Sequence, residues 1–374
     1  MATIDQVCRE MARYIDDEGV QYRGLLRIST EMGQLRGTNV DINVFIRTVL
    51  NAMNAHIGDD MIEMRCFSIL KKWVLQNEAI QVLVWQQGGA SSIIRVMLNR
   101  PQQRCNILRT GCTILACLSE GCPHVSQDVA LEGGVRAVVY AAPFIPHRDQ
   151  EEERALAGFA TTDIGVGAIV AQGGLHLLIS KLQMWITGWE CTDLERWTCE
   201  QMHTYRDIDT SFNLEITCNV LARVARTPLG MDAIVKEGGI LLVLDVMRLC
   251  VLTHTRIAYD GSSVTMSQEI KNGLQTTLCD LLVMFSDHED AIMCVIDNGG
   301  VAVLLDVQKD SHGVRRVEFA VSRILRGVHD VKTRIIQKNM SFANAMYRGG
   351  PASGIPPDIM RKIQKSAAPG TGVR

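Results

Sequence analysis

Apolar residues recur along this chain at the three- and four-residue spacing of amphipathic helices, and pairs of glycines interrupt the pattern. The pairs are Gly88-Gly89, Gly133-Gly134, Gly173-Gly174, Gly238-Gly239 and Gly299-Gly300. An aliphatic stretch precedes each pair, and a second one begins directly after it, as Ile240, Val243 and Met247 illustrate. This pattern predicts an all-helical chain in which each glycine pair marks a sharp bend.

The glycine pairs have a physical explanation at helix ends. A glycine adopts the left-handed backbone conformation without a Cβ clash, so the first glycine of a pair can end a short helix. The second glycine lets the two flanking helices approach closely. Thr227 and Pro228, a good N-cap and a good first helical residue, predict the start of one short helix. The capping-box spacing from Ser286 to Glu289 predicts the start of another.

A longer helix precedes each short one and repeats the motif Cys-x-x-Leu-x-x-apolar. The motif occurs at 112–118, 218–224 and 279–285, with one extra residue at 66–73 and its second half alone at 156–159 and 325–328. Cysteine behaves as a small buried hydrophobe, so Cys66, Cys112, Cys218 and Cys279 are expected to pack in the core. Ser322 occupies the cysteine position of the last unit.

The order of long helix, short helix, glycine bend and second helix resembles the armadillo-repeat family over residues 61–338. The first intervals between glycine pairs, 45 and 40 residues, match a helical repeat of about 40–47 residues, and the later ones, 65 and 61, fit the same unit with insertions. The resemblance implies a right-handed superhelical solenoid. We expect a helical cap at 1–60, the solenoid at 61–340 with insertions at about 186–211 and 253–267, and an extended Pro- and Gly-containing tail at 341–374.

Composition agrees with a folded protein that has an aliphatic core. Hydrophobic residues make up 47% of the chain but aromatic residues only 5%, so Leu, Val, Ile, Met and Ala must fill the interior. No apolar run approaches the roughly 18 residues of a membrane span, and the charged start of the chain does not have the pattern of a signal peptide. A cytoplasmic location with reduced thiols is therefore expected for the twelve cysteines.

Motifs for catalysis or cofactor binding are not found. The sequence has no phosphate-binding glycine loop, no Gly-x-Ser-x-Gly elbow, and no second histidine at metalloprotease spacing after His288 and Glu289. Cys117, Cys122 and His124 are a candidate zinc fragment, but they supply three ligands without the paired spacing of structural zinc sites. We therefore predict no enzyme activity, no cofactor, no metal and no small-molecule substrate.

Tryptophans cluster around the first predicted insertion. Trp185, Trp189 and Trp197 are three of the five tryptophans in the chain. Tryptophan is enriched at binding hot spots, so Trp189 and Trp197 are candidate partner contacts. The alternative is that the insertion folds back and buries these rings on the solenoid.

The C-terminal part of the chain is basic, although the formal net charge is −3. Residues 307–374 contain 13 Lys and Arg against 4 Asp and Glu, a net charge of +9, which leaves −12 for the remainder. At 100° per residue, Arg315, Arg316, Arg323 and Arg326 share one helix face opposite an apolar stripe. This face is either a solvated surface or a docking site for an acidic partner, such as a tubulin-like surface. Nucleic acid is not expected, because aromatic residues for base stacking are sparse here.

Peptide-binding members of the armadillo family present a ladder of asparagines on their long helices, just before the last apolar residue of the stripe. In this chain that position holds Lys72, Cys117, Arg223, Met284 and Gly327. None of them is asparagine, so peptide binding through an asparagine ladder is not expected. Lys72 and Arg223 are instead candidate partner contacts of a different kind.

Solenoid repeats bury their apolar stripes on one another and leave one long concave surface, which is typical of protein-binding scaffolds. We predict a non-enzymatic protein-binding scaffold or a structural component of a larger assembly. Armadillo-like proteins of this size occur in cilia and flagella, so the resemblance implies a cytoskeletal, axonemal role as one expectation. The alternative is a soluble regulatory adaptor that binds a peptide or a signalling domain in its groove. No membrane partner is expected.

Overall fold

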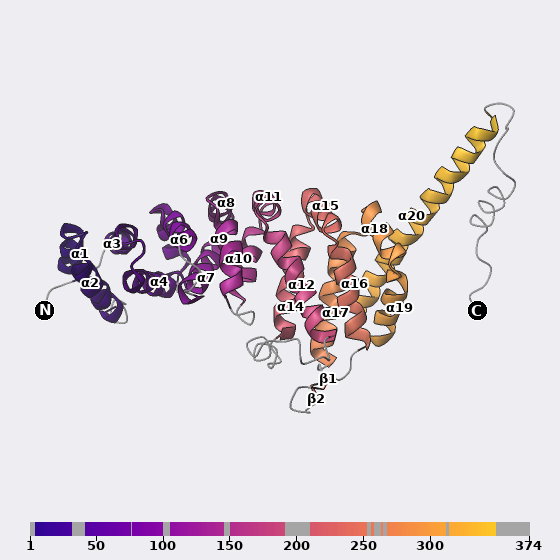
Figure 1. The fold of residues 1–374 in the computed structure, drawn as a ribbon. Coiled ribbons are helices and arrows are strands. Elements are labelled where there is room, and N and C mark those ends of the chain that lie inside the picture. Colours follow the sequence, from indigo (N-terminus) through magenta and orange to yellow (C-terminus); the bar gives the residue numbers. More distant parts are fainter. Residues whose placement is uncertain are drawn as a thin grey trace.

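In a computed structural model, the chain forms a rod of stacked helices that begins with α1 at one end and finishes with α20 at the other (Figure 1). The structure describes residues 4–31, 42–75, 77–99, 105–145, 150–190, 210–252, 256–257, 263–264, 268–311 and 314–348. In these residues the regular elements are helices, apart from one antiparallel hairpin of the two-residue strands β1 (Arg256–Ile257) and β2 (Ser263–Val264). The predicted helical solenoid is confirmed.

Five consecutive repeats each contain a first, a second and a third helix. The first helices are α5 (Glu78–Gln86), α8 (Pro123–Leu131), α11 (Asp163–Ala171), α15 (Pro228–Lys236) and α18 (Glu289–Asp297). The second helices are α6 (Gly89–Leu98), α9 (Gly134–Ala141), α12 (Gly174–Glu190), α16 (Gly239–Leu252) and α19 (Gly300–Asp310). The third helices are α7 (Cys105–Gly121), α10 (Glu151–Phe159), α14 (Thr210–Val224), α17 (Gln268–Met284) and α20 (Arg315–Arg348). The short 3₁₀ helix η1 (Ala142–Phe144) follows α9.

The second and third helices form two continuous rows through the rod. Each second helix contacts the second helix of the next repeat, and each third helix contacts the next third helix. At the N-terminal end, α1 (Ile4–Arg13) and α3 (Ile42–Ala55) extend the second-helix row, while α2 (Glu18–Glu31) and α4 (Asp60–Val74) extend the third-helix row. The cap at 1–60 remains a prediction, and the structure adds that its helices pack as further rungs.

Each glycine pair combines a special backbone conformation with a lack of space. The first glycines of the five pairs have φ between +69° and +99°, which favours glycine over every residue with a Cβ. A Cβ on Gly89 would lie 2.7 Å from the carbonyl oxygen of Val84, and one on Gly300 would lie 2.8 Å from that of Val295. The predicted roles of both glycines, helix termination and close approach, are confirmed.

The N-cap predicted at the start of the fourth short helix is confirmed. Thr227 caps α15, its Oγ1 accepts a hydrogen bond from the Gly230 N–H at 3.0 Å, and Pro228 is the first helical residue. Thr162 caps α11 in the same way, through the Gly165 N–H at 3.1 Å. The Thr-x-x-Gly spacing therefore starts two of the five first helices.

The capping box predicted from Ser286 is wrong. Helix α18 begins at Glu289 and its N-cap is His288, whose Nδ1 accepts a hydrogen bond from the Ala291 N–H at 3.3 Å. Ser286 is buried, and α20 packs so closely on its backbone that a Cβ on Gly327 would lie 2.4 Å from the Ser286 carbonyl oxygen. Packing between third helices therefore takes precedence over the local capping signal.

The recurrent cysteines belong to the core, as predicted. Cys66, Cys112, Cys218 and Cys279 are all 0% exposed. Burial raises the pKa of each thiol, to about 12 for Cys279, so these side chains stay protonated and neutral at physiological pH. Their role is to fill small spaces between third helices.

The assignment of Ser322 to a core position of α20 is wrong. Val321 is fully buried at the position assigned to Ser322, whereas Ser322 is exposed and donates a hydrogen bond to the Glu318 carbonyl oxygen at 2.8 Å. Val317, Ile324 and Val328 are buried on the same side of the helix, while Leu325 is half-buried. Ser322 therefore does not replace the core cysteine in the last repeat.

Two helices run past the boundaries expected from the sequence. Helix α12 continues to Glu190 with Ile186 buried, and residues 191–209 lie outside the described residues. Helix α20 continues past Ser341, where the tail was expected to begin, to Arg348, and it projects beyond the stack (Figure 1). The second expected insertion contains the β1–β2 hairpin.

The described part of the chain contains no single helix that is long and apolar enough to cross a membrane. One pair, Asp163–Ala171 with Gly174–Met184, meets the length and composition criteria only together and is bent by 69°. Leu175, Leu178 and Leu182 of this pair are fully buried in the stack.

Candidate interaction surface

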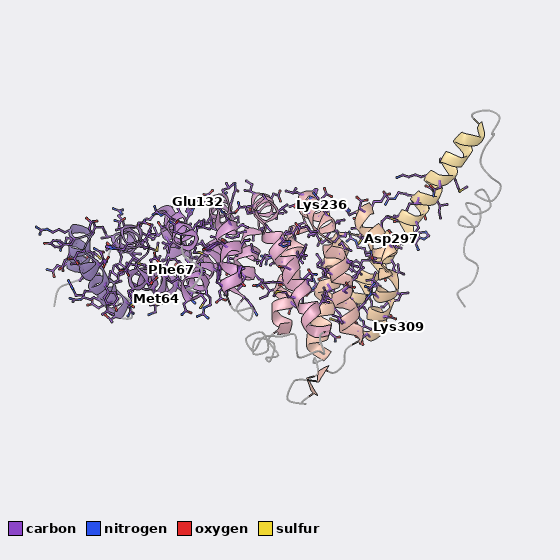
Figure 2. The ribbon with its side chains drawn as sticks, in the orientation of Figure 1. Met64, Phe67, Glu132, Lys236, Asp297 and Lys309 are labelled. Carbon is purple, nitrogen blue, oxygen red and sulfur yellow. The ribbon has the colours of Figure 1, made fainter. Side chains whose placement is uncertain are left out.

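Helix α4 exposes an apolar strip at the N-terminal end of the third-helix row. Met61, Met64 and Leu75 are exposed at the spacing of one helix face, and the exposed Lys72 lies on the same face. Met64 appears near the N-terminal end of the rod in Figure 2. The candidate contact Lys72 is therefore a surface residue with apolar neighbours on its strip.

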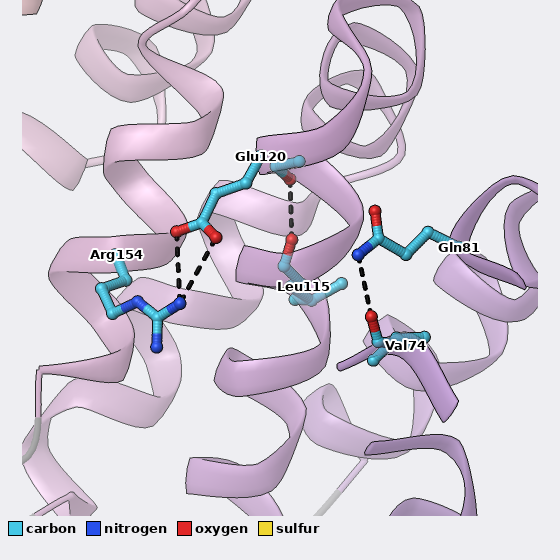
Figure 3. A network of polar contacts seen from close by, with 6 residues as sticks. Val74, Gln81, Leu115, Glu120 and Arg154 are labelled. Atoms are coloured by element: carbon cyan, nitrogen blue, oxygen red, sulfur yellow. Dashed lines mark hydrogen bonds and ion pairs between the residues drawn. The ribbon is translucent and has the colours of Figure 1, made fainter. Parts of the chain in front are cut away.

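The middle of the third-helix row has little free surface. Residues 111–119 of α7 are all buried. Glu120, which follows them, accepts hydrogen bonds from Arg154 of α10 at 3.3 and 3.4 Å (Figure 3). Arg223 of α14 donates to the Ala157 carbonyl oxygen at 2.8 Å and is half-buried. The candidate contact Arg223 thus links two rungs of the stack.

The position at which peptide-binding armadillo proteins carry asparagines is not a continuous exposed row in this chain. Lys72 and Met284 are exposed and Arg223 is half-buried, but Cys117 and Gly327 are buried. Side chains at this position therefore cannot line one uninterrupted groove.

Two ion pairs connect α20 to the preceding repeat, one to α17 and one to the turn that follows α17. Arg316 Nη2 lies 2.5 Å from Asp280 Oδ2, and Arg323 Nη2 lies 3.6 Å from Asp287 Oδ2. The partners of each pair are 36 residues apart, and the two pairs are separated by seven residues, or two helical turns. Exposed pairs of this kind contribute only about 0–1 kcal/mol each, but they neutralise two of the four arginines predicted as a docking face.

The other two arginines remain available around an exposed phenylalanine. Arg315 and Arg326 are exposed and have no ion-pair partner among the residues that the structure describes. Phe319 lies between them and is 67% exposed, more than any other large hydrophobic residue in the described part of the chain. All three face away from the buried Val317 and Ile324. We call Arg315, Phe319 and Arg326 the Phe319 strip.

Phe319 is not among the contacts predicted from the sequence, although the four predicted arginines surround it. A signal was present, because an aromatic residue four positions after Arg315 and seven before Arg326 falls on the same helix face as both. Of the tryptophans proposed as contacts, Trp189 lies in α12 with an undescribed side chain, and Trp197 lies outside the described residues. Both remain predictions.

A buried charge cluster joins α10 to α12 inside the stack. Lys181 Nζ lies 2.7 Å from Glu152 Oε1 and 2.5 Å from Glu153 Oε1. The side chains of Glu152, Glu153 and Lys181 are only 0%, 2% and 11% exposed. The second carboxylate oxygen of each glutamate is also buried and has no hydrogen-bond partner in the structure. Two carboxylates therefore share one ammonium group out of contact with water.

The cluster changes the protonation of its own members. Burial raises the pKa of Glu152 from its ordinary 4.5 to about 7, the positive charge of Lys181 opposes this rise, and Glu153 adds to it. Burial alone would lower the pKa of Lys181, but the charges of Glu153 and Glu152 outweigh burial and raise it. Near neutral pH, Glu152 is therefore partly protonated, and this reduces the net negative charge of the cluster of two glutamates and one lysine.

Replacing Glu152 with glutamine is expected to reduce the pH dependence of stability. Because the pKa of Glu152 is higher in the folded than in the unfolded state, its stabilising contribution is complete below about pH 4.5 and is lost as the pH rises through about 7. This shift corresponds to roughly 3 kcal/mol. The difference in unfolding free energy between wild type and Glu152→Gln, measured by urea denaturation, should change by about that amount between pH 4.5 and pH 8. A difference that is independent of pH would contradict the assignment.

The sequence contained an unused signal for this cluster. Glu153 precedes Leu156 and Phe159 at the spacing of the Cys-x-x-Leu-x-x-apolar motif, so it occupies the position of the core cysteines. Three consecutive glutamates at 151–153 are also favourable in the first turn of a helix, where they interact with the helix dipole. Because this explanation needs no burial, the sequence does not reveal that two of these glutamates are buried. Lys181 lies in a different helix, and nothing near it in the sequence marks it as the partner.

The candidate zinc fragment is not assembled into a metal-binding group in the structure. Cys117 is buried, Cys122 is the N-cap residue of α8, and His124 is exposed. Among the described residues, no group of three or more His, Cys, Asp or Glu side chains is placed to hold a metal ion.

Comparison with known proteins gave matches in structure but not in sequence. No family model and no curated protein matched the chain. A structure from work on a phosphorylation switch that controls the interaction between cadherin and beta-catenin matches with a TM-score of 0.61 and 13% identity, over 87% of this chain and 61% of that chain. A designed armadillo repeat protein in complex with the peptide (KR)4 matches with a TM-score of 0.52 and 11% identity, over 76% and 99%. An engineered protein matches with a TM-score of 0.53 and 17% identity, over 77% and 97%.

Proposed function

From the premise that this chain is an armadillo-like helical solenoid, we propose that it is a non-enzymatic scaffold that binds proteins along its third-helix surface. The observation behind this proposal is the unequal character of that surface. Its N-terminal part on α4 is apolar, its middle is closed by links between rungs, and its C-terminal part on α20 exposes Phe319 between arginines. Exposed apolar residues rimmed by charge are typical of protein interaction sites.

The third-helix surface is favoured over the edge of the rod that the first helices form. The first helices also expose leucines, such as Leu131 and Leu229, but these stand singly, one on each helix. Glu132 and Lys236, near the ends of α8 and α15, appear along this edge in Figure 2. Scattered apolar residues are normal on protein surfaces. The α4 strip instead gathers several apolar residues on one face, and Phe319 on α20 is flanked by two arginines, so these two places are the favoured partner contacts.

The scaffold proposal is tested by affinity purification with surface variants of the full-length chain. We expect a protein that is recovered in fixed ratio with wild type to be lost from Met64→Glu/Lys72→Glu on α4. The matched control, Leu131→Glu/Leu229→Glu on the first-helix edge, should retain it. Loss of the partner from the control and not from the α4 variant would refute the third-helix surface as the binding face.

We further propose that the chain is a structural component of a larger assembly, with the ciliary or flagellar axoneme as the candidate and an acidic, tubulin-like surface as the candidate partner. Among the matched structures, one is a complex with the peptide (KR)4 and another comes from work on the interaction between cadherin and beta-catenin, which supports a binding role. The alternative is a regulatory adaptor in the cytoplasm. An assembly component should resist detergent extraction with its neighbours, whereas an adaptor should be extracted freely.

A further inference from the structure

We propose that the Phe319 strip binds an extended acidic segment of a partner protein, with an aromatic or large aliphatic side chain of that segment covering Phe319. This inference rests on the proposed scaffold function and defines the chemistry of one segment that the scaffold would bind. It goes beyond a general basic face, because it selects two of the arginines and adds the phenylalanine between them.

Four of the other cations of α20 already have ion-pair partners, which distinguishes them from Arg315 and Arg326. Arg316 pairs with Asp280 of α17, and Arg323 pairs with Asp287 in the turn that follows α17. Farther along the helix, Arg334 and Lys338 lie 3.5 and 3.7 Å from the carboxylate of Glu289. The arginines of the Phe319 strip lack such an acceptor in the described structure, so their charge is free to attract carboxylates of a partner.

Phe319 supplies the apolar part of the site. The ion-paired residues of the last two repeats are 36 positions apart, and by the same spacing Phe319 of α20 corresponds to Val283 of α17. The next residue of α17, Met284, is exposed. The phenyl ring is 67% exposed and supplies the apolar part of the strip. A ring that is largely in water gains by being covered, and aromatic residues beside arginine are the residue types enriched at binding hot spots.

The spacing on α20 defines the spacing in the partner. At 1.5 Å per residue along a helix, Arg315 lies about 6 Å before Phe319 and Arg326 about 10 Å after it. An extended chain advances about 3.3 Å per residue, so these distances correspond to about two and three residues. The segment that fits has the pattern acidic-x-aromatic-x-x-acidic and runs parallel to α20.

Two segments of the chain itself are alternative occupants. Residues 349–374 contain four basic residues and one acidic residue, so their charge does not complement the strip. Residues 191–209 contain five acidic and two basic residues together with Trp197, so they share the chemistry of the proposed partner. The experiment must therefore separate a partner segment from residues 191–209.

The test titrates the full-length chain against a fluorescein-labelled peptide with the core Glu-Ser-Phe-Ser-Ser-Glu, followed by fluorescence anisotropy. We expect wild type to bind the peptide and Phe319→Ala and Arg315→Gln/Arg326→Gln each to bind at least about tenfold more weakly. The matched control Arg334→Gln/Lys338→Gln removes two cations that are paired with Glu289 and should stay within about twofold of wild type. Added salt should weaken binding to wild type more than to Arg315→Gln/Arg326→Gln.

Several results would overturn the inference. They are failure of wild type to bind the peptide, equal binding by wild type and Phe319→Ala, and equal binding of a peptide in which serine replaces phenylalanine. Tighter binding of a peptide with the sequence of residues 191–209 would assign the strip to the chain itself and remove the partner. None of these results touches the scaffold proposal, which is tested by the α4 variant.

Discussion

Replacing Lys181 with methionine is expected to lower the free energy of unfolding by about 3–5 kcal/mol. Lys181 is the only cation within ion-pair distance of Glu152 and Glu153 in the described structure, and both glutamates are buried. Without the ammonium group, two carboxylates would face each other in a medium that solvates neither. Their protonation would relieve part of the repulsion, so the loss should be larger at pH 8 than at pH 5.

The free energy of unfolding of Lys181→Met, measured by chemical denaturation, is compared with that of a matched control variant. Lys309→Met removes a lysine that is 76% exposed and 3.5 Å from Asp306, and its effect should stay within about 0.5 kcal/mol. A triple variant, Lys181→Met with Glu152→Gln and Glu153→Cys, should recover most of the lost stability, because it restores the cysteine found in other repeats and leaves no buried charge. If Lys181→Met is as stable as Lys309→Met, the three charges are not buried together as described.

Replacing Phe159 with alanine is expected to cost about 3–5 kcal/mol and to divide the unfolding transition. Phe159 is fully buried in α10, and its ring lies against α9, since a Cβ on Gly134 would come within 2.9 Å of its Cζ. Its carbonyl oxygen leaves no room for a side chain on Gly165 of α11. The residue thus holds together three helices in the middle of the stack, where a cavity cannot be filled by a neighbouring loop.

A solenoid responds to such a cavity differently from a globular domain. Each repeat contacts only its neighbours, so weakening one rung near the centre lowers the coupling between the two ends of the array. Thermal unfolding followed by circular dichroism should change from one transition to two in Phe159→Ala. Phe319→Ala is the matched control, because the same substitution at an exposed ring should change stability by less than about 0.5 kcal/mol. Identical unfolding curves for the two variants would contradict this account.

The helical rungs and their bends could be predicted because their signals are local. A left-handed glycine and a second glycine without space for a Cβ depend on residues within about five positions, as the contact of Gly89 with Val84 shows. The Thr227 cap depends on three residues. The same local reasoning failed at Ser286, where the third helix of the next repeat packs on the serine backbone.

The candidate binding surface could be predicted only in part. Helical periodicity placed Arg315, Arg316, Arg323 and Arg326 on one face, but the aspartates that pair with two of them lie in the preceding repeat, 36 residues away. Nothing in the sequence indicates that residues so far apart form ion pairs, because they come together only when the repeats stack. The sequence therefore predicted a basic face, and the stacking selected which arginines stay unpaired.

The sequence by itself determined that this protein is a string of aliphatic helices with glycine bends, because backbone conformation and helix amphipathicity are set by near neighbours in the chain. Only the tertiary structure decided which charges are buried and which are free. Glu153 stands in a cysteine position and is held by Lys181 from α12, and Phe319 stays in water between two unpaired arginines. Burial and pairing of charge depend on contacts between helices, and the residues that make those contacts are far apart in the sequence.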